Sequence, residues 1–84
     1  MTNDFILLKA SSISGLVFPE LTEKQAVSVI MYSLFGRQRA SKIMQISDST
    51  LKTHLRRSSD AIEREDSDEW ECVFILHLAE ILTS

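Results

Sequence analysis

Residues 21–36 carry the signals of a helix with both ends marked, and this segment constrains the fold more than any other. Thr22 followed three residues later by Gln25 is a capping box, in which each side chain satisfies a backbone N–H group of the other. Gly36 stands where a residue with left-handed backbone conformation ends a helix. Between these ends, apolar residues recur at spacings of three and four, which predicts a buried stripe of Val27, Ile30, Met31 and Leu34.

Two further helices are predicted directly after this one. Residues 37–44 place three apolar side chains on one face, which predicts a short helix that buries Ala40, Ile43 and Met44. Residues 45–47 interrupt the pattern, and Ser47 is a favourable N-cap for a third helix over about residues 48–62. The predicted buried residues of the third helix are Leu51, Leu55 and Ile62.

The other side of the third predicted helix is polar and lies in a basic part of an acidic chain. Its polar stripe, at helical spacings of three and four, consists of Ser49, Lys52, Thr53 and Arg56. The chain has a formal net charge of −3, yet residues 36–64 contain seven basic and three acidic residues. Residues 65–84 contain six acidic and no basic residues. A solvated helix face has a similar composition, so the stripe indicates phosphate binding only if the fold gathers the cations on one surface.

A helix, a short turn and a second helix with an exposed polar face are typical of the helix-turn-helix, whose second helix enters the DNA major groove. The segment from Leu21 to about Ile62 also resembles the LuxR/GerE-type DNA-binding domain. The most specific part is the run Ile46-Ser47-Asp48-Ser49-Thr50-Leu51-Lys52-Thr53-His54, which is similar to the family pattern I-S-x-x-T-V-K-x-H. The chain departs from the family pattern at Gln25, where a glutamate is expected, and at Gln45, where the turn often has glycine.

The resemblance implies an all-α, four-helix LuxR-like domain and assigns roles to individual residues. Thr50 and Lys52 match positions that approach the DNA backbone, and Leu51 matches the residue that holds the recognition helix to the core. His54 matches the family histidine, for which a structural role is expected. The predicted DNA-binding residues are Ser49, Thr50, Lys52, Thr53, Arg56, Arg57, Arg37 and Arg39.

A last helix is predicted after Ser67-Asp68-Glu69, which would cap it and complement its dipole. Its residues are apolar almost all round, so it either lies centrally in the chain or packs against another copy. In the LuxR/GerE family the helix after the recognition helix is a dimer contact, which favours the second alternative. The predicted dimer interface consists of Trp70, Val73, Phe74, Leu78 and Ile81, with core packing kept as an alternative for Trp70.

Residues 1–20 are the least informative part of the sequence. An apolar run at Phe5 to Leu8 precedes a serine-containing stretch and Pro19, which fits either a loosely packed arm or a short helix or strand on the core. The expected organisation is an N-terminal arm over 1–20, a helix-turn-helix core over 21–64 and a dimerisation helix over 65–84.

Other classes of protein find little support in the sequence. No catalytic triad, paired carboxylates or glycine-rich phosphate loop stands out, so an enzyme is not expected. Cys72 and His77 have too few companions for a zinc site, and Cys72 is expected to pack as a small apolar residue, so neither metal nor cofactor is predicted. One cysteine, no signal peptide and no membrane-spanning run favour a cytoplasmic protein.

The expected function is that of a sequence-specific, homodimeric transcriptional regulator with residues 48–62 as recognition helix. Its expected partners are double-stranded DNA and a second copy of the chain, with RNA polymerase or another regulator as a further possibility. The alternative is a protein-interaction module or anti-activator that uses the same fold to capture another transcription regulator.

Overall fold

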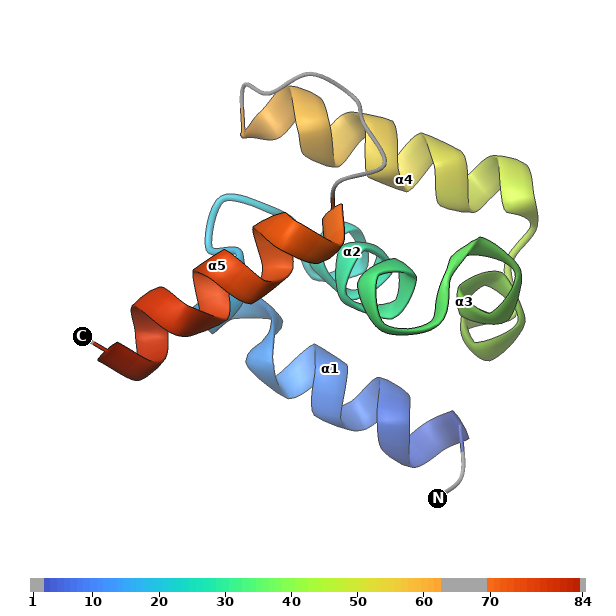
Figure 1. Ribbon diagram of the computed structural model, residues 1–84. Helices are drawn as coiled ribbons and strands as arrows, with labels where there is room; N and C mark the ends of the chain where they lie inside the picture. Colours follow the sequence, from blue (N-terminus) through green and yellow to red (C-terminus); the bar gives the residue numbers. More distant parts are fainter. Residues whose placement is uncertain (1–2, 63–69, 84) are drawn as a thin grey trace.

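The protein is all-helical in the part of the chain that the computed structural model describes, residues 3–62 and 70–83 (Figure 1). These residues form five helices and no strand. The helices are α1 (Asn3–Val17), α2 (Glu23–Phe35), α3 (Arg37–Met44), α4 (Asp48–Ala61) and α5 (Trp70–Thr83). The predicted all-α class is therefore confirmed, with one helix more than expected.

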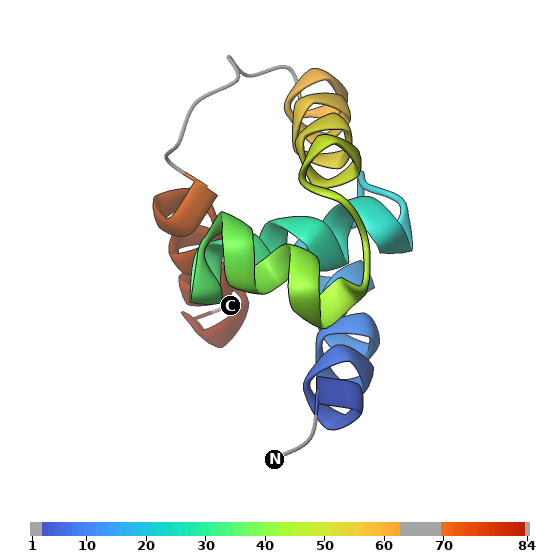
Figure 2. The ribbon, with the colours of Figure 1, turned by 90° about the vertical axis from the view of Figure 1, so that its right-hand side faces the viewer.

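Helix α2 is the centre of the fold and packs against each of the other four helices. Figures 1 and 2 show α4 on one side of α2 and α1 on the other, with α5 lying across α2. Residues 26–31 of α2 are buried without interruption, whereas a helix at the surface of a protein buries only one stripe. Helix α2 is thus enclosed by its neighbours on several sides.

Helix α2 begins and ends where the sequence predicts, and its capping box is confirmed. The Gln25 N–H donates to Thr22 Oγ1 at 3.3 Å, and the Thr22 N–H donates to Gln25 Oε1 at 3.2 Å. Gly36 ends the helix at φ 81° and ψ 173°, so its φ is positive as expected but its ψ is extended rather than left-handed. The prediction that Leu34 is buried is wrong, because 56% of its surface is exposed. Leu34 borders an open pocket between α1, α2 and α5.

Helices α3 and α4 also form where they were predicted, although Met44, predicted to be buried with Ala40 and Ile43, is only partly buried. The Ser47 side chain caps α4 by accepting a hydrogen bond from the Thr50 N–H at 3.1 Å. Leu51 and Leu55 are buried as predicted, while Ile62 is only partly buried. The connection begins with Gln45 in the left-handed conformation, where glycine would be less strained.

Residues 3–17 form a helix rather than a loose arm. Helix α1 packs on α2, α3 and α5, and its buried residues Ala10, Ser14 and Val17 recur at helical spacing. The Ser11 hydroxyl donates to the Glu23 carboxylate at the start of α2. This helix accounts for the difference between the four helices expected and the five described.

Helix α5 is attached to the core through an aromatic cluster around Phe18, which is fully buried. The Phe18 ring meets Trp70 edge to face at a centroid distance of 6.4 Å and is stacked with Phe74 at 6.5 Å. His77 lies over the same ring at 4.7 Å, and its Nδ1 is 2.8 Å from the carbonyl oxygen of Val17. These contacts hold α5 to the end of α1.

Two of the predicted features cannot be compared with the structure. The expected cap at Ser67-Asp68-Glu69 and the side chain of Cys72 lie outside the described residues. Within 3–62 and 70–83, no helix has both the length and the apolar character needed to cross a bilayer.

The attachment of α4 can be tested with one substitution made at two leucines. Leu51→Ala should lower the free energy of unfolding by about 2–5 kcal/mol, because it leaves a cavity at a fully buried site. Leu34→Ala removes the same atoms from an exposed site and should cost less than about 1 kcal/mol. Chemical denaturation measures both values, and equal losses would contradict the packing of α4 described above.

Candidate nucleic-acid interface

The start of α4 is fixed by hydrogen bonds between short polar side chains. In addition to the backbone bond that caps the helix, the hydroxyl groups of Ser47 and Thr50 lie 2.9 Å apart. Asp48 occupies the first turn, where a negative charge complements the helix dipole. Its carboxylate would repel a phosphate placed at the same point, so an anion would be held by side chains farther along α4.

One side of α4 is buried and the other is exposed. The buried side carries Leu51, Leu55, Ser58 and Ser59. Most of the polar side chains predicted to bind DNA are exposed, namely Ser49, Thr50, Lys52, Arg56 and Arg57, and Thr53 is partly buried. Lys52 and Arg57 are about 140° apart around the helix axis, so they flank the exposed surface on opposite sides.

The hydroxyl groups on this surface differ in what they can still bind. Thr53 Oγ1 donates its proton to the Ser49 carbonyl at 2.9 Å, so in this rotamer it can only accept a further hydrogen bond. A phosphate oxygen cannot donate, whereas the exocyclic amino groups of cytosine and adenine can. Thr53 is therefore suited to a base edge and not to the DNA backbone.

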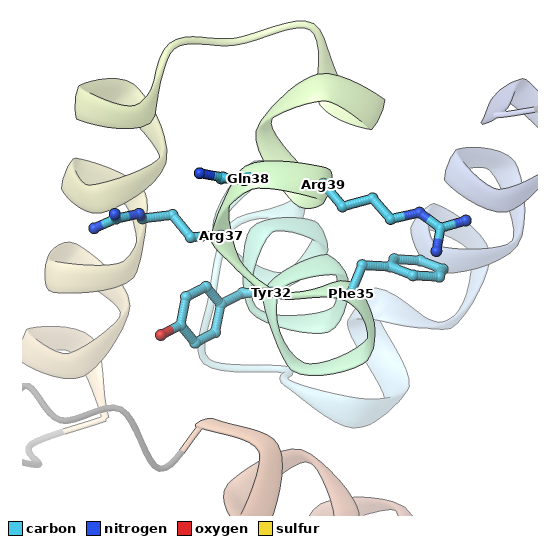
Figure 3. A pocket seen from close by; sticks show the side chains of 5 residues that line it. All are labelled: Tyr32, Phe35, Arg37, Gln38 and Arg39. Atoms are coloured by element: carbon cyan, nitrogen blue, oxygen red, sulfur yellow. The ribbon is translucent and has the colours of Figure 1, made fainter.

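The two arginines predicted on α3 point in different directions. Figure 3 shows Arg37 extending toward the side of α4, while Arg39 extends toward α1. The two side chains line a pocket at the start of α3 with Tyr32, Phe35 and Gln38. The Arg39 guanidinium lies 4.8 Å from the centre of the Phe35 ring. Arg37 can extend the surface of α4, but Arg39 belongs to another side of the molecule.

The structure adds a cation that the sequence did not reveal. Burial lowers the pKa of the His54 imidazole below its ordinary value of 6.5, and the positive charges of Lys24 and Arg57 lower it further. Lys24 therefore lies close to His54 on α4, although it belongs to the first turn of α2. The capping box predicted from the sequence places Lys24 in the first turn of α2. The sequence could not show that α4 packs beside it, because this is a contact between distant parts of the chain.

The predicted dimer residues are divided between the core and the surface. Trp70 and Phe74 are only 1% and 5% exposed, so Phe74, predicted to lie in a dimer interface, instead packs its ring on Phe18 within the same chain. Three others, Val73, Leu78 and Ile81, are partly buried against this core. Among the described side chains of α5, the large apolar ones that are exposed are Ile75, Leu76 and Leu82.

The described residues contain no group of three or more His, Cys, Asp or Glu side chains arranged to hold a metal ion. Comparisons with protein-family models, with curated proteins and with solved structures found no match to this chain.

The environment of His54 predicts a pH dependence of stability. Because the folded-state pKa lies below that of the unfolded chain, the unfolded chain binds more protons once the pH falls through 6.5. The free energy of unfolding should therefore decrease from about pH 7.5 to about pH 5, and the decrease should be smaller in His54→Gln. Denaturant titrations of both proteins at each pH isolate this contribution, since the two proteins differ only at residue 54. Parallel pH profiles would contradict the assignment.

Proposed function

We propose that the chain is a sequence-specific DNA-binding regulator of the LuxR-like helix-turn-helix type, acting as a homodimer with α4 in the major groove. The observation that carries the proposal is the exposed side of α4. It presents small hydroxyl side chains between two flanking cations, while the opposite side is held by Leu51 and Leu55. Helices α2, α3 and α4 would then be the three helices of the DNA-binding unit.

The arrangement of charge on α4 fits the shape of the groove. The major groove is about 12 Å wide and admits one α-helix, whose sides then face the two phosphate backbones. Lys52 and Arg57, on opposite flanks, would each neutralise a phosphate on one wall. Ser49, Thr53 and Arg56 lie between them and would face the base edges.

Further cations extend this surface beyond α4. Lys24 at the start of α2 lies close to His54, and Arg37 at the start of α3 extends toward the side of α4. Both would contact the DNA backbone and set the orientation of the domain, because phosphate contacts position a protein without reading sequence. Arg39 is left out of this surface, since it extends toward α1 (Figure 3).

The exposed apolar side of α5 supports the second part of the proposal. Ile75, Leu76 and Leu82 are each more than half exposed and recur on one side of the helix. A twofold contact through this surface would hold two copies of α4 for two half-sites about one helical turn of DNA apart. The same apolar side chains also favour the second candidate, a module that captures another transcription regulator through α5.

The first experiment measures binding to duplexes selected from a random pool. Arg56→Ala should weaken binding by roughly 1–3 kcal/mol and relax the sequence preference, because Arg56 is expected to face the base edges, whereas Lys52→Ala should weaken binding about equally for all sequences. Neither substitution should change helix content, because both side chains are exposed. Loss of a phosphate contact should also reduce the slope of log affinity against log salt by about 1. The matched control is Lys9→Ala, which removes a lysine of α1, on the other side of α2 from α4 (Figures 1 and 2).

Three results would distinguish the candidates. A loss of DNA affinity in the α4 variants alone supports the DNA-binding proposal. An equal loss of affinity in Lys9→Ala would mean that binding depends only on the net charge of the protein. An intact protein that selects no duplex even at low salt would contradict the proposal and favour the interaction module.

The dimer is tested by a charge placed on the apolar side of α5. Leu76→Glu should convert the protein into a folded monomer, because the side chain is 62% exposed within its own chain and is buried only by association. The DNA affinity of this variant should also fall, since a monomer has one recognition helix and a dimer has two. Leu8→Glu, at an exposed leucine of α1, is the control. Sedimentation decides the outcome, and an intact protein that is monomeric at micromolar concentration and still binds DNA tightly would rule out the dimer.

A further inference from the structure

An open apolar pocket lies between α1, α2 and α5, with a volume of about 590 Å³. Its floor is formed by side chains that are almost fully buried, namely Ala10, Ile30, Met31 and Phe74. Phe5 and Leu34 also line it and remain about half exposed. The volume is in the range of about 300–1,000 Å³ that is usual for pockets that bind small molecules.

Two cations border this apolar space. Lys9 of α1 and Arg39 of α3 line the pocket and are exposed to solvent, so they lie at its rim. The Lys9 ammonium lies 5.5 Å from the centre of the Phe5 ring, and the Arg39 guanidinium lies over Phe35 (Figure 3). Both rings line the same pocket. Among the described residues, no aspartate or glutamate lines it.

We propose that this pocket binds a small amphipathic carboxylic acid, with its apolar body on the floor and its carboxylate between Lys9 and Arg39. Two cations and no acidic side chain give the rim a positive potential, which favours an anion over a neutral or cationic ligand of the same shape. The floor supplies the apolar surface that such a ligand covers. Lys9 and Arg39 come from different helices, so the carboxylate would join α1 to α3. The proposal does not depend on DNA binding.

Three probes with the same hydrocarbon chain test the charge preference. Octanoate should bind at one site per chain, 1-octanol more weakly and octylammonium most weakly, as measured by titration calorimetry. Amide and methyl resonances of residues that line the pocket, such as Ile13 and Leu34, should shift when octanoate is added. Octanoate should also raise the thermal midpoint, since a ligand that binds only the folded chain stabilises it. Saturable binding in that order supports the proposal, and equal binding of all three probes, or none, overturns it.

Variants locate the site. The double variant Lys9→Gln/Arg39→Gln should weaken octanoate binding by roughly three- to tenfold and leave octanol binding unchanged, because only the carboxylate loses its partners. Lys42→Gln removes an exposed lysine of α3 that does not line the pocket and should have no effect. Leu34→Trp fills the pocket from an exposed position and should weaken both probes without lowering the thermal midpoint. Unchanged octanoate binding in both Leu34→Trp and the double variant would place the ligand elsewhere and overturn the proposal.

Discussion

The burial of α2 is the constraint on which the rest of the structure depends. Residues 26–31 are buried in succession, so this helix cannot be stable in water unless other helices cover several of its sides. An 84-residue chain has room for few helices with which to do so, and all four of the other helices in residues 3–62 and 70–83 pack against α2. Each of them therefore keeps one side against α2.

The position of α4 follows from this arrangement. Among the described helices it contacts only α2 and α3, through a buried side on which Leu51 and Leu55 are the large residues. Ser58 and Ser59 are buried beside them, and the Ser58 hydroxyl is satisfied by the His54 carbonyl at 2.7 Å. Small residues at this point allow α4 to pack closely, while the Ser47 cap fixes where it starts. The exposed side of α4 thus takes no part in the packing, which is what the proposed reading of base edges would require.

Local signals in the sequence were sufficient for the helices from α2 to α4 but not for what surrounds them. The caps at Thr22 and Ser47 and the positive φ of Gly36 depend on neighbouring residues only, so the helix ends could be predicted. The inward orientation of Phe74 and the closeness of Lys24 to His54 depend on contacts between distant parts of the chain. For the same reason the apolar pocket had no signal in the sequence. The two-residue spacing of Arg37 and Arg39 places them on different sides of α3, but which neighbouring helix each one faces depends on the packing.

The segregation of charge explains how a chain with net charge −3 can present a surface for an anion. Charges on a protein surface are screened over about 8–10 Å at physiological salt, so a bound phosphate responds to nearby groups and not to the net charge. On α4, Lys52, Arg56 and Arg57 outnumber Asp48 and Asp60. The two aspartates lie near the ends of the helix, whereas the cations lie along its middle. Attraction is therefore greatest where the exposed side of α4 is centred. The pKa of His54 is lowered first by burial, and the positive charges of Lys24 and Arg57 lower it further.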